Sequence, residues 1–241
     1  MKKSIMKKSI LVIAIALVAL AQTAQADFSQ TFTVNAGIPD GSLVGWSDTR
    51  AVPVQPGNTL DVNVTLNLGG GWNGDLYAYL VHNTGFAVLL NRVGRETGNK
   101  AGYGDAGMNV KLDDQATRLY DIHFYQKEFG YQASDITGGA SWKPDGRNIS
   151  PLSSQDLFTV GGARDAVLGS FNNQNAGGNW TLFIADVSGG DVSTLTSWTL
   201  EIAAVPEPAS LIEGAVAALF LGGAICVFRL KGKKVQLPAA A

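Results

Sequence analysis

Few residues in this chain could carry catalytic chemistry. Its 241 residues include two histidines, His82 and His123, and one cysteine, Cys226. Each histidine lies in or at the end of a strand-like stretch, where a lone imidazole is more often structural than catalytic. A Ser/His/Asp set can be assembled on paper from Asp75, His82 and any serine, but no Gly-x-Ser-x-Gly turn presents a nucleophile. We therefore expect no enzyme; a hydrolase with an unrecognised site in the long loops is the alternative.

Three aspartates are the candidate metal ligands. Asp75, Asp186 and Asp191 lie near glycines at the ends of expected strands, where loops of a β-sheet protein converge. Several carboxylates together with loop carbonyls suit Ca²⁺, a hard cation that takes six to eight oxygen ligands. The competing interpretation is that Asp simply favours turns. Cys226 lies in an apolar stretch near the C-terminus, so neither a disulfide within the chain nor a cysteine zinc site can form.

Three tryptophans are the candidate ligand-binding residues. Trp46, Trp72 and Trp142 lie in segments rich in Gly and Asp that we expect to be loops. Exposed loop aromatics stack on sugars and peptides, so together they could form a binding face, although packing over the sheet ends is the commoner use. Trp180 and Trp198 begin expected strands and are predicted to belong to the core.

The elements that must position these residues are strands. Residues 61–68 alternate without a fault, with Val62, Val64, Leu66 and Leu68 on one face. Further strands are expected at 75–81, 86–90, 119–125, 180–185 and 198–202, and loops at 69–74, 91–116 and 126–156. No helical period occurs between residues 27 and 204. Short strands separated by turn signals predict an all-β fold, namely a jelly-roll-like β-sandwich.

The order of these segments resembles the P domain of the proprotein convertases. The resemblance covers most of residues 31–203 and is strongest over 178–202. The matching segments are 38–40, 64–68, 74–76, 79–80, 178–186, 190–191 and 195–202. It implies a jelly roll of about eight strands. In that family the P domain stabilises a subtilisin-like catalytic domain, which has no counterpart here, so a peptidase role would come from family transfer alone.

Charge excludes two classes of ligand. Residues 27–204 hold 10 Lys and Arg against 18 Asp and Glu, a net charge of −8. Such an acidic surface argues against nucleic acid and anionic lipid. It is compatible with cation binding, and it also keeps an exported domain soluble.

The N-terminus predicts export. Lysines at positions 2, 3, 7 and 8 precede an apolar run and then Ala24-Gln25-Ala26. This order is typical of a secretory signal over residues 1–26, cut by signal peptidase between Ala26 and Asp27. The alternative is a membrane anchor, but the apolar run is too short to span a bilayer comfortably.

The C-terminus predicts a second sorting event. Pro206-Glu207-Pro208 is followed by an apolar stretch over 211–228 and then by four basic residues. Eighteen helical residues span roughly 27 Å, enough for one transmembrane helix, and the basic cluster should stay cytoplasmic. Residues 205–234 resemble the PEP-CTERM sorting signal, which implies that exosortase cuts near Pro206–Pro208. Glu213 and the tail 235–241 depart from that pattern. A plain single-span anchor is the alternative.

Together these features predict an exported, non-catalytic domain over residues 27–204. It would cross the inner membrane, stay transiently anchored, and reach the outer surface or the extracellular matrix. There it would serve structure, adhesion or ligand binding, with extracellular polysaccharide or surface proteins as partners. The alternative is an accessory module that acts in trans on a separate subtilisin-like serine protease.

Overall fold

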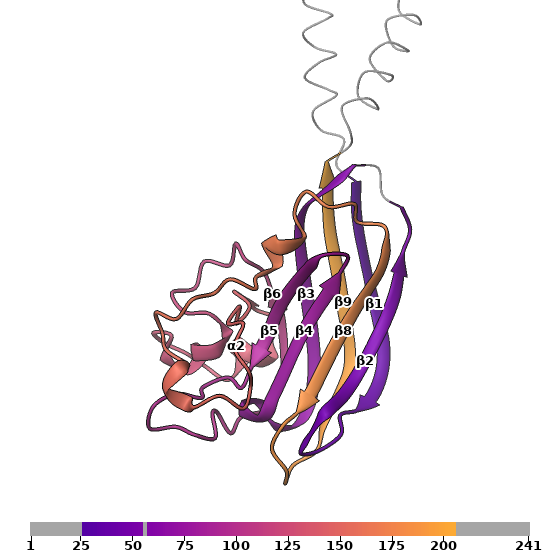
Figure 1. Cartoon of the computed structure of the whole chain (residues 1–241). Helices are drawn as coiled ribbons and strands as arrows, with labels where there is room; N and C mark the ends of the chain where they lie inside the picture. Colours follow the sequence, from indigo (N-terminus) through magenta and orange to yellow (C-terminus); the bar gives the residue numbers. More distant parts are fainter. Residues whose placement is uncertain (1–25, 55–56, 206–241) are drawn as a thin grey trace, which may run out of the picture. The chain divides into compact units, whose positions relative to one another are not determined.

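Nine β-strands occur in the part of the chain that the computed structural model describes, residues 26–54 and 57–205 (Figure 1). The strands are β1 (Ala26–Gly37), β2 (Ser42–Val52), β3 (Asn58–Trp72), β4 (Leu76–His82), β5 (Gly85–Asn91), β6 (Ala106–Leu112), β7 (Ser141–Trp142), β8 (Gly178–Asp186) and β9 (Ser193–Val205). Helical segments are short: η1 (Asn73–Asp75), η2 (Ile122–Lys127), α2 (Ser134–Thr137), η3 (Gln155–Leu157) and η4 (Leu168–Phe171). The expected all-β fold is confirmed.

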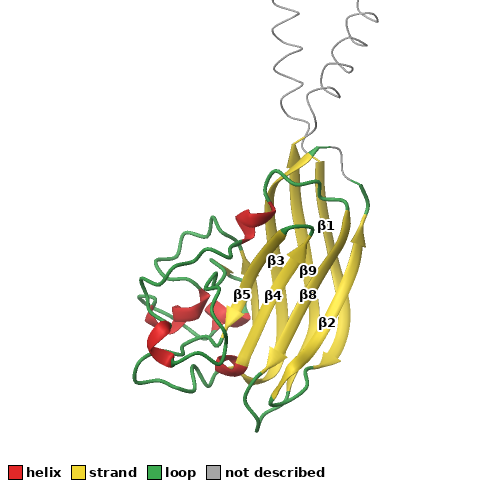
Figure 2. Ribbon diagram, viewed as in Figure 1, coloured by secondary structure: helices red, strands yellow, loops and turns green. Residues whose placement is uncertain are grey.

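The strands form two sheets. One has the order β1-β9-β3-β6-β7 and the other the order β2-β8-β4-β5. The registered strand pairs are antiparallel except β6 with β7. Side chains from both sheets, such as Leu66 and Leu200 on one and Leu80 and Leu182 on the other, share one buried core. The molecule is therefore a two-layer sandwich, and the layers are visible in Figure 2.

Strand β3 follows directly from its sequence. Val62, Val64, Leu66 and Leu68 are at most 5 % exposed, while the residues between them are partly exposed. The alternation predicted for residues 61–68 is therefore confirmed. The expected loop at 69–74 is wrong in its first part, because β3 continues to Trp72. Gly70 and Gly71 make this continuation possible: both have φ in the left-handed region, and the register with β6 shifts between Leu68 and Trp72.

Residues 92–105 and 113–176 form a loop-rich lobe beside β5 and β6 (Figure 1). Two expectations fail here. Strand β6 lies inside the predicted loop 91–116, and the predicted strand 119–125 is largely the 3₁₀-helix η2. The helix forms because Asp121 caps it, accepting a hydrogen bond from the His123 backbone nitrogen at 3.0 Å. Residues 122–125 are then all buried, which a half-exposed strand would not allow.

Both sorting segments lie almost entirely outside the described residues. Ala26 is the first residue of β1 and Val205 the last of β9. Pro206, Glu207, Pro208, the predicted helix 211–228 and the tail 235–241 fall outside. Within residues 26–54 and 57–205, no helix combines the length and apolar character needed to span a membrane.

Candidate functional site

His82, at the end of β4, is held from three sides. Its exposure is 1 %, and its ring stacks on Trp180 with centroids 4.1 Å apart. The two ring nitrogens lie 2.9 Å and 2.8 Å from the carbonyl oxygens of Asn179 and Asn175. With both nitrogens occupied, this imidazole has no free position for proton transfer to a substrate.

His123 belongs to a buried ionic cluster in the lobe. Its Nδ1 lies 2.6 Å from Asp145 Oδ2, and its Nε2 lies 2.8 Å from the carbonyl oxygen of Arg95. Arg147 then bridges Asp145 and Asp121 at 3.0–3.1 Å. The side chains of His123 and Asp145 are fully buried. Both ring nitrogens are therefore engaged by oxygen atoms of the protein, so neither is free to act as a general base on a substrate.

The pKa shifts in this cluster favour the charged forms of Asp145 and Arg147, as expected of a structural ion pair. Burial acts to raise the pKa of the Asp145 carboxyl, but His123 and Arg147 outweigh it and hold that pKa below its usual range. Hydrogen bonding and the Asp145 charge raise the pKa of Arg147 against the opposing effect of its own burial. No sequence signal indicated this cluster, because its members come from the predicted strand 119–125 and the predicted loop 126–156, and nothing in the sequence shows that these two segments meet.

The three candidate tryptophans do not share a face. Trp46 lies within strand β2 and is partly buried against the core. Trp142 is fully buried in β7, where its Nε1 donates to the Asp135 carbonyl at 2.8 Å and Arg118 covers its ring at 4.1 Å. Trp72 is 43 % exposed, and Trp46 is partly exposed. The predicted binding role is therefore wrong for Trp142 and stays a prediction for Trp46 and Trp72, whereas the core role predicted for Trp180 and Trp198 is confirmed.

The structure does bring Asp75 and Asp186 together. Asp186 ends β8 opposite Leu76 of β4, and the Val187 backbone nitrogen donates to the Asp75 carbonyl at 2.9 Å. Arg92 forms an ion pair with the Asp75 carboxylate, with its Nη2 3.2 Å from Oδ1. Burial nevertheless leaves the pKa of Asp75 raised, since it outweighs Arg92. Sequence reasoning missed Arg92, whose backbone adopts a left-handed conformation after β5.

Asp186 is the most perturbed carboxyl at this end of the sandwich. It is fully buried, its Oδ1 accepts from the Ser188 backbone nitrogen at 3.3 Å, and its Oδ2 has no hydrogen-bond partner. Burial, together with the nearby Asp75 and Asp40 carboxylates, raises the pKa of Asp186 to about 6. Asp191 lies in the exposed turn before β9, near enough for its charge to contribute to the raised pKa of Asp75.

These aspartates are not a ready metal centre. Across the described residues 26–54 and 57–205, no three His, Cys, Asp or Glu side chains gather closely enough to hold a metal ion. Arg92 already supplies a positive charge to Asp75. Calcium binding by Asp75, Asp186 and Asp191 stays a prediction, and it would require Asp191 to move toward the other two.

Asp186→Asn is expected to stabilise the protein above pH 6. The pKa of Asp186 is higher in the folded chain (about 6) than its ordinary 3.8, so its contribution is fully present below about pH 4 and is lost as the pH rises through 6. A neutral amide avoids that loss, which we put at about 1–2 kcal/mol near neutral pH after allowing for solvent screening. Thermal melts in chelator between pH 4.5 and 8 measure it, with Asp191→Asn as the exposed control.

Parallel pH profiles for wild type and Asp186→Asn would contradict this account. Repeating the melts with millimolar Ca²⁺ tests the calcium prediction on the same samples. A rise in wild-type melting temperature that Asp186→Asn lacks would support a calcium site. Identical wild-type melts in Ca²⁺ and chelator would leave the three aspartates as turn residues.

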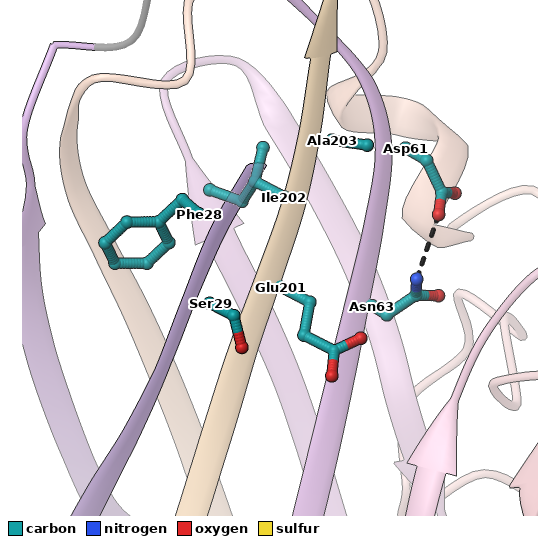
Figure 3. Close-up of a pocket in the computed structure, with 7 residues that line it drawn as sticks. All are labelled: Phe28, Ser29, Asp61, Asn63, Glu201, Ile202 and Ala203. Carbon is teal, nitrogen blue, oxygen red and sulfur yellow. Dashed lines mark hydrogen bonds between the residues drawn. The ribbon is translucent and has the colours of Figure 1, made fainter. Parts of the chain in front are cut away.

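A shallow hollow of about 250 Å³ lies on the outer face of the five-stranded sheet. Figure 3 shows its lining side chains, contributed by β1, β9 and β3: Phe28, Ser29, Asp61, Asn63, Glu201, Ile202 and Ala203. Asn63 Nδ2 donates to Asp61 Oδ2 at 2.9 Å, and Lys111 forms an ion pair with Glu201. Asn63 Oδ1, in contrast, is buried without a hydrogen-bond partner, so the hollow presents a hydrogen-bonding surface without a reactive group.

Comparison with known proteins adds little to this geometry. No family model matches the chain, and no curated protein sequence matches it. Solved structures similar to it include the serine protease of Aeromonas sobria, both in complex with the chaperone ORF2 (TM-score 0.41, 17 % identity, 75 % of this chain) and by itself (TM-score 0.41, 15 % identity, 76 % of this chain). This chain spans 27 % of the length of each matched chain. The similarity is too low to transfer a function.

Proposed function

We propose that this chain is an exported, non-catalytic β-sandwich that acts at the cell surface or in the extracellular matrix as a binding or structural module. Three features support the proposal: the position of the domain's two ends, the engagement of both histidines, and the order of the strands.

The position of the two ends is the observation that carries the proposal. Ala26 pairs with Ala204 and Asp27 with Ala203, so the beginning of β1 lies beside the end of β9 (Figure 1). The expected signal peptidase site and the expected exosortase site thus adjoin the same end of the sandwich. The loops before β2 and between β8 and β9 lie at the other end, about 35 Å away along β1. A domain tethered or trimmed at one end would keep those loops free for contact.

The same pairing orders the processing steps. A protease binds its substrate as an extended, unpaired segment, whereas Asp27 is hydrogen-bonded into the β1–β9 ladder once the domain has folded. Cleavage by signal peptidase before Asp27 therefore precedes folding. Exosortase would act next to Val205, the last residue of β9.

The engagement of the titratable groups supports a role without catalysis. His82 and His123 each have both ring nitrogens occupied, and Asp145 is sealed by His123 and Arg147. A general base needs a lone pair within reach of a substrate, and neither imidazole offers one.

The strand order supports a jelly roll. Without the two-residue β7, the sheets have the orders β1-β9-β3-β6 and β2-β8-β4-β5. Successive strands β1, β2, β3 and β4 then alternate between sheets, as do β8 and β9, so two sets of four strands interlock across the core. This is the architecture that the P-domain resemblance implies.

Surface accessibility tests the proposed location. Antibody raised against the purified protein should label intact cells or recover the protein from the culture medium. Recovery only after the inner membrane is broken would contradict export. Deleting residues 2–23 is the control, and it should retain the chain inside the cell.

A further inference from the structure

A second pocket, of about 340 Å³, lies in the loop-rich lobe. Six residues line it: Leu119, Tyr120, Asp121, Lys143, Val160 and Arg164. Neither the sorting segments nor the aspartate end of the sandwich involves these residues.

The pocket is positive within an acidic domain. Lys143 and Arg164 contribute two positive charges against the one negative charge of Asp121, which Arg147 already binds through both carboxylate oxygens at 3.1 Å and 3.0 Å. Residues 27–204 as a whole are acidic: they hold ten Lys and Arg against 18 Asp and Glu, a net charge of −8, and all of the ten but Arg50 lie within residues 92–164. A lining with one excess positive charge suits a ligand group with a single negative charge.

Both cations retain free hydrogen-bond donors. Lys143 Nζ donates to the Arg118 carbonyl at 2.9 Å, which uses one of three N–H groups. Arg164 donates from Nε to the Asp145 carbonyl at 3.0 Å, with Asp121 Oδ2 3.5 Å from the same nitrogen, and from Nη2 to the Pro144 carbonyl at 2.6 Å, which uses two of its five N–H groups. These bonds to backbone oxygens fix both side chains in place. The remaining donors can form charge-assisted bonds to a carboxylate.

The backbone around the pocket contributes no further donors at residues 119 and 120. The backbone nitrogens of Leu119 and Tyr120 already donate to the two carboxylate oxygens of Glu128, at 3.4 Å and 3.1 Å. The anionic part of a ligand would therefore meet the side chains of Lys143 and Arg164.

The rim of the pocket is apolar and aliphatic. Leu119 is 74 % exposed and Val160 is 49 % exposed, although both are large hydrophobic residues. Covering them would remove apolar surface from water, which favours binding by about 25 cal/mol per Å². Both are more exposed than Tyr120, the one aromatic residue of the lining, so the accessible apolar surface is mainly aliphatic and suits an apolar side chain.

We propose that this pocket binds the C-terminal carboxylate of a peptide whose last side chain is aliphatic. The carboxylate would bond to Lys143 and Arg164, and the side chain would pack on Leu119 and Val160. This proposal rests on the proposed function in one respect only, namely that the domain acts as a binding module. The two fail separately, because cell fractionation tests export and titration tests the pocket.

Titration of the full chain with N-acetyl-Ala-Leu and with its C-terminal amide tests the proposal. The free acid should bind at least about tenfold more tightly than the amide, and added salt should narrow the difference. Equal binding of acid and amide, or binding of neither, would overturn the proposal. Tighter binding of oligogalacturonate or inorganic phosphate than of the peptide acid would also overturn it, since the site would then belong to another ligand class.

Two substitutions locate the binding. Leu119→Asp places a negative charge at the rim. It should weaken binding of the free peptide acid about tenfold or more without lowering the melting temperature of the protein. Leu152→Asp, at a similarly exposed leucine outside the pocket, is the control. It should change neither the affinity for the peptide acid nor the melting temperature. Lys143→Met should bring the affinities of acid and amide together, which a purely structural lysine would not do. Unchanged acid preference in both pocket variants would overturn the assignment.

Discussion

Replacing Arg147 with Met is expected to cost about 3–5 kcal/mol of stability, enough to unfold a marginally stable domain. The Arg147 side chain is 2 % exposed and bonds to Asp121 and Asp145. Met fills a similar volume but leaves the buried Asp121 carboxylate with the His123 backbone nitrogen and, as its remaining cation, the more distant Arg164 at 3.5 Å. Removing one partner of a buried ion pair leaves an uncompensated charge, which costs far more than the pair itself contributes.

Urea unfolding at pH 7 measures this loss. The matched control is Lys111→Met, which breaks the half-exposed pair with Glu201 and should cost less than about 1 kcal/mol. Because the folded pKa of Asp145 lies below its ordinary 3.8, the stability from this carboxylate is present above about pH 4 and is lost as the pH falls through the folded value. The difference between Arg147→Met and wild type should therefore shrink in acid. Equal losses for both variants at pH 7 would contradict a structural role for the cluster.

Val64→Asp is expected to prevent folding. Val64 is fully buried at the centre of β3, where it faces the core shared by the two sheets. An unpaired carboxylate there costs several kcal/mol or more and leaves a void where the valine methyls packed. Circular dichroism should lose its β signature, and amide NMR signals should collapse to the narrow range of an unfolded chain.

The control lies one residue away. Thr65 is on the outer face of β3 opposite Lys111, so Thr65→Asp should be tolerated. Asn63 is a poorer control, because it bonds to Asp61 and an aspartate there would set two carboxylates side by side. Retention of a folded β domain by Val64→Asp would contradict the assignment of the core face.

The alternating strands could be predicted because each buries one face. Residues 61–68 and 180–185 show their inward residues as a period of two, and the structure confirms both. Residues 108–112 in β6 alternate in the same way, but the glycines and aspartates around them obscured the strand. The strand predicted at 119–125 is wrong because residues 122–125 are all buried in η2. An alternation of apolar and polar side chains therefore does not indicate which of them face the core.

The candidate sites were less predictable, since they depend on contacts between distant segments. Asp75 and Asp186 could be placed at one end because both lie at strand ends, yet nothing local in the sequence indicates that Arg92 faces Asp75. Trp142 sits among loop residues, but Arg118 and the Asp135 carbonyl enclose it. A glycine-rich neighbourhood indicates irregular backbone, and it says little about exposure when that backbone folds into a packed lobe.

Intact-mass analysis of the protein recovered from the cell surface and medium tests the proposed export and display most directly. We expect a species that begins at Asp27 and ends near Pro206–Pro208, without the apolar stretch 211–228. A surface species that starts at Asp27 but keeps 211–228 would contradict exosortase processing while leaving display in place. A chain that retains residues 1–26 and never leaves the cytoplasm would contradict the account as a whole.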